Sequence, residues 1–184
     1  ASGMASPVKV MINGSPLLPD GLENGDFSGG LVVPAGDATL RFIIAGIDPL
    51  ETAVTIPQGA SILMGLSSKT EVDPKTKQPI RKLVLTPVGG EAQDSTKGYR
   101  LWVKNFLDKD MVPAQLGAQT LYLKRDEIQE VQGYNGKPFM LGMRGNAGKR
   151  FNPSEPGSLV AALVPDDKNG AFAIMFRINK YSTP

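Results

Sequence analysis

The chain has 184 residues, with 20 basic and 18 acidic side chains, a formal net charge of +2, no cysteine and no histidine. The lack of cysteine excludes disulfides and thiolate chemistry, and the lack of histidine excludes Ser-His-Asp and Cys-His catalytic arrangements within this chain. The near-balanced charge predicts that nucleic acid is not a partner, and no apolar run reaches the ~20 residues of a membrane span.

Turn-forming residues punctuate the chain at short intervals. It contains 21 glycines and 15 prolines, and Asn-Gly pairs begin at Asn13, Asn24, Asn135 and Asn169. Asn-Gly readily adopts the positive φ angles of the type I′ turn that joins two antiparallel strands. Between these breaks, alternating or continuous apolar runs predict strands over residues 8–13, 39–45, 53–56, 61–66, 80–86, 99–106, 120–124, 138–144, 158–164 and 171–179. Only residues 111–117 and 126–131 could hold a short helical turn, so the predicted fold class is all-β.

A polar stretch rich in small residues divides the chain. Residues 89–98 read Gly-Gly-Glu-Ala-Gln-Asp-Ser-Thr-Lys-Gly, which is typical of a linker. We therefore expect two antiparallel β-sandwich lobes, residues 7–88 and 99–181. The order of features repeats between them, with residues 8–13 matching 101–106 and residues 57–63 matching 155–160. This repetition suggests an internal duplication.

Three segments of the first lobe carry a pattern of turns and strands. They are Val-Lys-Val-Met-Ile-Asn-Gly-Ser-Pro at 8–16, Val-Val-Pro-Ala-Gly at 32–36 ahead of Leu-Arg-Phe at 40–42, and Val-Thr-Ile-Pro-Gln-Gly-Ala-Ser-Ile-Leu at 54–63. The pattern resembles bacterial secreted β-sandwich repeat proteins of unknown function, whose units are prealbumin-like or carboxypeptidase-regulatory-like. The resemblance implies an extracellular, periplasmic or cell-surface location, with the signal peptide outside this chain, and a structural or binding role. It supplies no catalytic residue.

Acidic side chains provide the alternative to a binding role. The candidate carboxylate groups are Asp108 with Asp110, Asp126 with Glu127 and Glu130, and Asp166 with Asp167. A glycosidase needs two carboxyl groups about 5–10 Å apart and no histidine, so a carboxylate hydrolase with a site between the lobes is the rival hypothesis. The same residues also fit solvated turns. The loops at 108–110 and 166–170 hold oxygen ligands but lack EF-hand spacing and each includes a lysine, so we predict no metal site and no cofactor.

Five residues are the candidate ligand-binding residues: Arg100, Trp102, Arg144, Lys149 and Arg150. On the strand at 99–106, alternation directs Leu101 and Val103 to the core and Arg100 and Trp102 to the other face. Trp102, the single tryptophan, either stacks on a sugar or fills an interface between the lobes with a cation against its ring. Residues 142–150 form a glycine-rich basic stretch that lacks the Gly-Lys-Ser/Thr of a phosphate loop. We expect a hairpin tip there, and it is the first place to look for an anionic ligand.

The leading hypothesis is therefore a non-catalytic, exported β-sandwich protein. It would act as a structural, adhesive or ligand-binding module of the cell envelope, with another envelope protein or a glycan as its partner. The hydrolase is the alternative. A third possibility is a peptide binder that accepts a strand along an exposed sheet edge.

Overall fold

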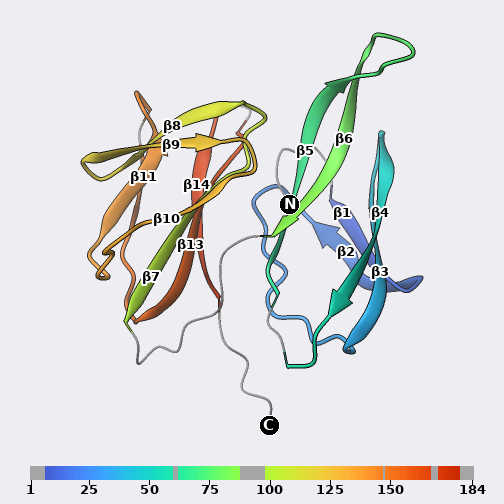
Figure 1. Cartoon of the computed structure of the whole chain (residues 1–184), viewed down its shortest axis with the longest axis horizontal. Coiled ribbons are helices and arrows are strands. Elements are labelled where there is room, and N and C mark those ends of the chain that lie inside the picture. The colour runs from blue at the N-terminus through green and yellow to red at the C-terminus, as the bar shows by residue number, and fades with distance from the viewer. Residues whose placement is uncertain (1–6, 60–61, 88–97, 147, 167–169, 179–184) are drawn as a thin grey trace. The chain divides into compact units, whose positions relative to one another are not determined.

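The computed structural model describes residues 7–59, 62–87, 98–146, 148–166 and 170–178, which form strands and no helix (Figure 1). The predicted all-β class is confirmed. The chain divides into two compact units, Ala1–Thr86 and Pro87–Pro184. Apart from Gly98, the predicted linker at 89–98 lies outside the described residues. The first unit contains β1 (Val8–Ile12), β2 (Ser15–Leu22), β3 (Gly36–Ile44), β4 (Ile47–Ile56), β5 (Met64–Val72) and β6 (Pro79–Pro87).

The larger sheet of the first unit is antiparallel, with the strand order β2-β1-β3-β4. Ile12 pairs with Ser15, and the two residues between them, Asn13 and Gly14, have φ angles of 48° and 79°. The predicted Asn-Gly turn is therefore confirmed at this position. β2 contains two prolines and was not predicted as a strand. Its place at the sheet edge explains them, because an edge strand tolerates a missing N–H.

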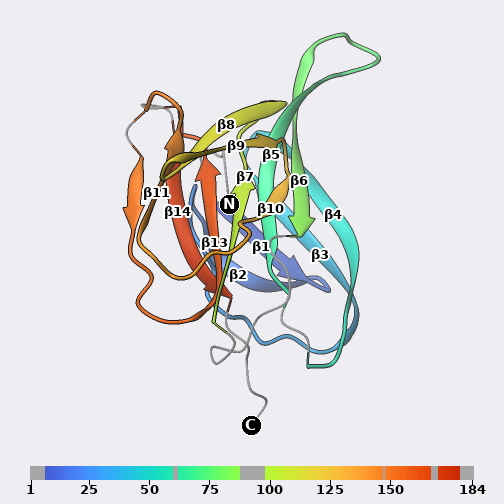
Figure 2. The same cartoon turned by 60° about the vertical axis from the view of Figure 1, so that its left-hand side comes forward.

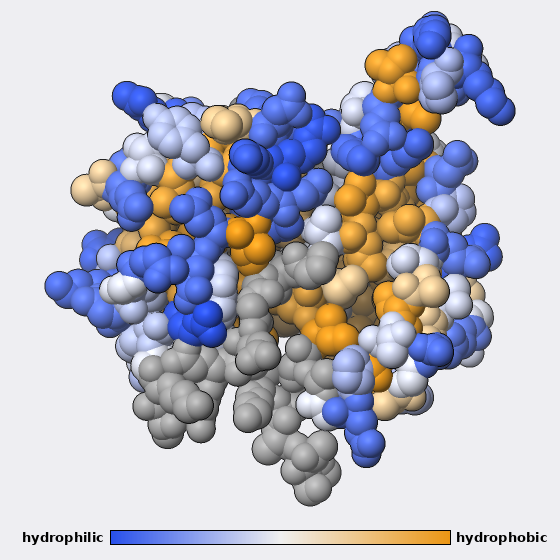
Figure 3. Space-filling view, viewed as in Figure 1, coloured by the Kyte–Doolittle hydropathy of each residue, from blue (hydrophilic) through white to orange (hydrophobic). Residues whose placement is uncertain are grey.

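A second layer of the first unit comes from β5 and β6, which form a two-stranded sheet. Figures 1 and 2 show the tip of this hairpin projecting past the ends of the larger sheet. Leu66 and Leu83 from the hairpin pack against Val8, Val10 and Phe42 of the larger sheet. The two-stranded sheet covers only part of the four-stranded sheet, so the inward apolar side chains of β4 stay half-buried. Figure 3 shows hydrophobic residues at the surface between β6 and β4.

The second unit has two four-stranded sheets, ordered β10-β7-β13-β14 and β12-β11-β8-β9. Their strands are β7 (Tyr99–Asn105), β8 (Met111–Leu116), β9 (Gln119–Lys124), β10 (Ile128–Glu130), β11 (Phe139–Met143), β12 (Lys149–Phe151), β13 (Gly157–Val164) and β14 (Phe172–Ile178). Inward residues of both sheets share one core, which includes Leu101 and Val103 as predicted. The sheets therefore pack face to face.

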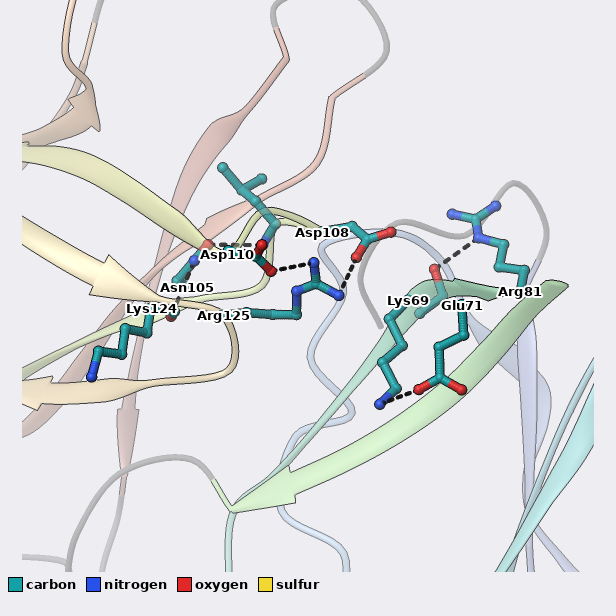
Figure 4. A network of polar contacts seen from close by, with 10 residues as sticks. Lys69, Glu71, Arg81, Asn105, Asp108, Asp110, Lys124 and Arg125 are labelled. Carbon is teal, nitrogen blue, oxygen red and sulfur yellow. Dashed lines mark hydrogen bonds and ion pairs between the residues drawn. The ribbon is translucent and has the colours of Figure 1, made fainter. Parts of the chain in front are cut away.

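The first sheet of this unit contains a parallel pair that the predicted antiparallel lobes did not include. β7 pairs with β13 from Tyr99 opposite Gly157 to Asn105 opposite Leu163. β13 lies between β7 and β14, and all eight of its residues are buried. The buried Asn105 side chain also joins the two sheets, since its Nδ2 donates to the Lys124 carbonyl at 3.2 Å and its Oδ1 accepts from the Leu107 N–H at 2.9 Å (Figure 4).

Both segments considered for a helical turn hold strands instead. Residues 111–116 are β8, at the centre of a sheet, although Pro113 lies within it. The Pro113 carbonyl accepts from the Arg144 N–H at 3.0 Å, just past the end of β11. In an antiparallel strand the N–H and C=O of one residue point to the same neighbouring strand. The N–H that Pro113 lacks would therefore face β11, at the position where the hydrogen bonds between β8 and β11 end. Residues 128–130 form the short edge strand β10.

The two units do not share a strand order at the positions that the duplication equates. β1 pairs antiparallel with β2 and β3, whereas its counterpart β7 pairs with β10 and, in parallel, with β13. Residues 57–63, matched to 155–160 at the start of β13, precede β5, which pairs with β6 alone. The internal duplication therefore stays a prediction.

Truncating Leu163 tests the shared core of the second unit. Leu163 is fully buried among residues of both sheets, so Leu163→Ala should destabilise this unit by about 2–5 kcal/mol. The single tryptophan, Trp102, lies in the same unit, and its fluorescence in a urea titration follows that transition. Met111→Ala, at an exposed position of the same unit, is the control and should shift the transition by no more than ~0.5 kcal/mol. Equal effects of the two substitutions would contradict the assigned core.

Candidate functional site

The β11–β12 hairpin fixes where each basic residue of the glycine-rich stretch lies. Phe139 pairs with Phe151, Met140 with Arg150 and Leu141 with Lys149. Paired residues of antiparallel strands point to the same face, so Lys149 shares the inner face with the buried Leu141. Arg150 shares the outer face with Met140. The register therefore places two adjacent cations on opposite sides of one sheet.

A cavity of about 730 Å³ lies on the inner side of this hairpin. It is lined by the end of β11, the start of β12 and the ends of β13 and β14 that face them. Its apolar lining consists of Leu141, Leu163 and Ala173, which are almost fully buried, and of Phe172, Ala171 and Met143, which are at least partly exposed. Asn146, Lys149 and the backbone of three glycines supply the polar part of the wall. The cavity is open to solvent and combines polar and apolar groups, as a small-molecule site requires.

Lys149 is the cationic group of this cavity. Its Nζ lies 5.6 Å from the centre of the Phe151 ring, which belongs to the core of the second unit. Among the residues that the structure describes, Lys149 forms no ion pair with a carboxylate. Its alkyl chain can cover apolar surface while the ammonium group stays at the mouth of the cavity. The arrangement can therefore neutralise one negative charge close to the exposed apolar surface of Phe172.

The glycines of this hairpin serve its conformation. A Cβ on Gly148 would lie 3.1 Å from the carbonyl oxygen of Leu141, and Gly145 has a φ of 91°. No helix follows the loop, so the phosphate-loop arrangement is absent from this part of the chain. The loop is the hairpin tip that the sequence predicts. Ala147 lies outside the described residues.

Arg144 and Arg150 do not join Lys149. Arg150 lines a separate cavity of about 210 Å³ with Gly117, Pro138, Phe139 and Met140. The exposed Arg144 continues the alternation that directs Met140 to the outer face of the sheet. The three basic residues predicted as one anion site are thus divided, with one at the inner cavity and two on the outer face.

Trp102 lies on β7 between Glu130 of β10 and Val160 of β13. Its side chain is only 5% exposed, and the Arg100 guanidinium carbon lies 4.6 Å from the ring centre. Little of the indole is therefore available to stack on a sugar. The predicted cation against the ring is confirmed, and the interface between lobes stays a prediction.

Arg100 is held by Glu130 as well as by the indole. Its Nε donates to one carboxylate oxygen at 2.8 Å and its Nη2 to the other at 3.1 Å. These hydrogen bonds lower the pKa of Glu130. A glycosidase acid needs the opposite shift, so Glu130 is suited to the ion pair and not to proton donation.

The other carboxylates of this unit are also held locally. Arg125 donates from Nη1 to Asp108 at 3.0 Å and from Nη2 to Asp110 at 2.8 Å, so one guanidinium joins both acids (Figure 4). The Glu127 carboxylate accepts from the Lys124 N–H at 2.7 Å. Asp166 is described and Asp167 lies outside the described residues. Among those described, no group of three or more acidic side chains forms a candidate metal site.

Lys104 is a buried charged residue on the same face of β7 as Trp102. It has no exposed surface, its Nζ donates to the backbone carbonyl of Asp126, and its Nζ lies 5.4 Å from the Phe106 ring. Burial lowers the pKa of the Lys104 ammonium group, and the charge of Asp126 opposes the shift in part. Its position facing away from Leu101 and Val103 was predictable, but its burial was not.

Most residues of the cavity carry no signal in the sequence. Leu163 comes from β13, Phe172 and Ala173 come from β14, and Ala171 directly precedes β14, all outside the basic stretch. Each reads as an ordinary strand residue, and only the packing of the two sheets brings them to the hairpin.

Comparison of the sequence with models of known protein families and with curated proteins finds no match. In the described part of the chain, no helix is long and apolar enough to cross a membrane.

The buried Lys104 predicts a pH-dependent stability. Because its folded pKa is lowered from 10.5, the unfolded chain holds more protons between the two pKa values, so stability rises as the pH rises through that window. Lys104→Met should flatten this rise, measured by urea unfolding with Trp102 fluorescence between pH 7 and 10. The exposed Lys109→Met should keep the wild-type slope. An unchanged slope in Lys104→Met would show that the lysine is not buried as a charge.

Proposed function

We propose that the second unit is a ligand-binding module and that its ligand is a small amphiphilic anion held in the cavity inside the β11–β12 hairpin. The observation that carries the proposal is the register of this hairpin, which directs Lys149 to the side of the cavity. A carboxylate or phosphate-like head would accept hydrogen bonds from the Lys149 ammonium. Its apolar body would lie on Phe172, Ala171 and Met143, the apolar lining residues that are at least partly exposed.

A binding role is preferred to a catalytic one because the candidate acids that the structure describes in the second unit already have partners. Arg125 holds Asp108 and Asp110, and Arg100 holds Glu130. A hydrolase needs one carboxyl group free to exchange a proton and another free to act as base or nucleophile. The cavity is lined by no acidic side chain among the described residues.

The wider role that we propose is that of an exported, non-catalytic protein of the cell envelope. It rests on the resemblance of the first unit to secreted prealbumin-like repeat proteins, together with the confirmed all-β class. In this setting the second unit would supply the ligand site and the first unit a structural or adhesive part.

The test measures binding of octanoate and octyl phosphate to the whole chain by titration calorimetry. Lys149→Gln should weaken both about tenfold, since a hydrogen bond to a charged group contributes about 1.5–3 kcal/mol. Ala171→Leu, which fills the cavity from its wall, should weaken them as well. Lys137→Gln is the matched control, because Lys137 is exposed and does not line the cavity.

One neutral and one cationic probe show whether the negative charge of the ligand decides binding. Octanol and octyltrimethylammonium should bind more weakly than octanoate. If they bind equally well, or if Lys149→Gln behaves like Lys137→Gln, the anion site is wrong. Amide chemical shifts of Gly142, Gly145 and Gly148 should move on octanoate addition and identify the location.

A further inference from the structure

The outer face of the sheet β12-β11-β8-β9 is a second surface with its own composition. Its register is set by the strand pairs Met140–Arg150, Gly142–Gln115, Gln115–Thr120, Pro113–Tyr122 and Met111–Lys124. Their neighbours Val112, Ala114, Leu121 and Leu123 are all buried on the inner face. The alternation therefore directs every one of the paired residues outward.

Three large apolar side chains are exposed on this face. Tyr122 is 59% exposed, Met111 55% and Met140 48%. Figure 3 shows isolated hydrophobic side chains among hydrophilic ones over β8 and β9. Aromatic, methionine and arginine side chains are the types enriched at interaction surfaces.

The charge on the same face has one sign. The four strands contain no aspartate and no glutamate. Lys124 and Arg150 lie on outward positions at opposite edges of the sheet, Lys124 level with Met111 of β8 and Arg150 level with Gly117 just after β8. Three strand spacings across the sheet and six residues along the strands place them roughly 25 Å apart. Arg144 follows β11, and its N–H donates to the Pro113 carbonyl opposite Tyr122. The neighbouring Asp110 already pairs with Arg125.

An ordered polar row lies between the two apolar ends of the face. The Thr120 hydroxyl donates to Gln115 Oε1 at 3.0 Å, and Gln115 Nε2 donates to the Gly117 carbonyl at 2.9 Å. These contacts hold the Gln115 and Thr120 side chains in place before any partner arrives. An open sheet face with cations spread across it and one exposed ring matches an extended polymer better than a compact ligand.

We propose that this outer face binds an anionic polysaccharide. A sugar ring stacks on Tyr122, and carboxylate or sulfate groups of the chain pair with Arg144, Arg150 and Lys124. A second copy of this chain is disfavoured, because two acid-free cationic faces repel each other. Single-stranded nucleic acid is disfavoured because it needs several stacking rings in succession, and this face exposes one.

The experiment measures binding of the whole chain to four polymers at 50 and 500 mM salt. Polygalacturonate carries carboxylates, dextran sulfate carries sulfates, dextran is neutral, and oligo-dT carries phosphates. We expect binding to one or both anionic polysaccharides that weakens with salt, and little binding to dextran. Whichever of the two binds more tightly identifies the anionic group.

Variants separate the face from general charge. Tyr122→Ala should lower affinity about tenfold, the size of loss typical of one stacking contact, while Tyr122→Phe should retain it. Arg150→Gln should weaken binding and reduce its salt dependence, and Lys9→Gln, an exposed lysine of the first unit, should not. Lys149→Gln should leave polysaccharide binding unchanged, so this proposal and the proposed cavity can fail separately. Unchanged binding in Tyr122→Ala, or tighter binding of oligo-dT than of both anionic polysaccharides, would overturn the proposal.

Discussion

The alternation of side chains along a pleated strand governs almost every feature of the second unit. One residue in two enters the core and the next leaves it, so adjacent residues can have unrelated roles. On β7, Leu101 enters the core while Trp102 meets the guanidinium of Arg100. On β12, Lys149 faces the cavity while Arg150 faces outward. A change of register by one residue would exchange these roles throughout the sheet.

The distribution of charge follows from the same constraint. Acidic side chains gather between the end of β7 and the start of β8 and where β9 leads into β10, and each cluster there is tied to an arginine or to a backbone N–H. All charged side chains in the strands of the sheet β12-β11-β8-β9 are cationic. The structure thus offers two basic environments that differ in shape, one a partly open cavity with polar and apolar lining, the other an open sheet face. Their chemistry suits different ligands even though they lie on two faces of one sheet.

Local patterns were enough to predict the strand class, the turn at Asn13-Gly14 and the core positions of Leu101 and Val103. They failed where the answer depended on distant segments. Pro113 suggested a helical turn, but β8 is held by β9 on one side and β11 on the other. The two prolines of β2 argued against a strand there, although β2 is the edge strand of its sheet. The cavity was invisible because Leu163 and Ala173 meet the β11–β12 hairpin only after two sheets have packed. The division of Arg144, Lys149 and Arg150 required the hairpin register, which a glycine-rich loop of uncertain length does not reveal.

The parallel pairing of β7 with β13 has a consequence for the order of folding. The four-stranded sheet of the first unit joins neighbouring segments, which a growing chain can pair soon after they are made. In the second unit β7 is made first, yet one of its two neighbours, β13, follows five other strands in the sequence. Closing so long a loop is slow compared with forming a hairpin. During synthesis the apolar strand β7 would wait, incompletely paired, until nearly the whole unit has emerged, and this interval is when the chain is most exposed to aggregation.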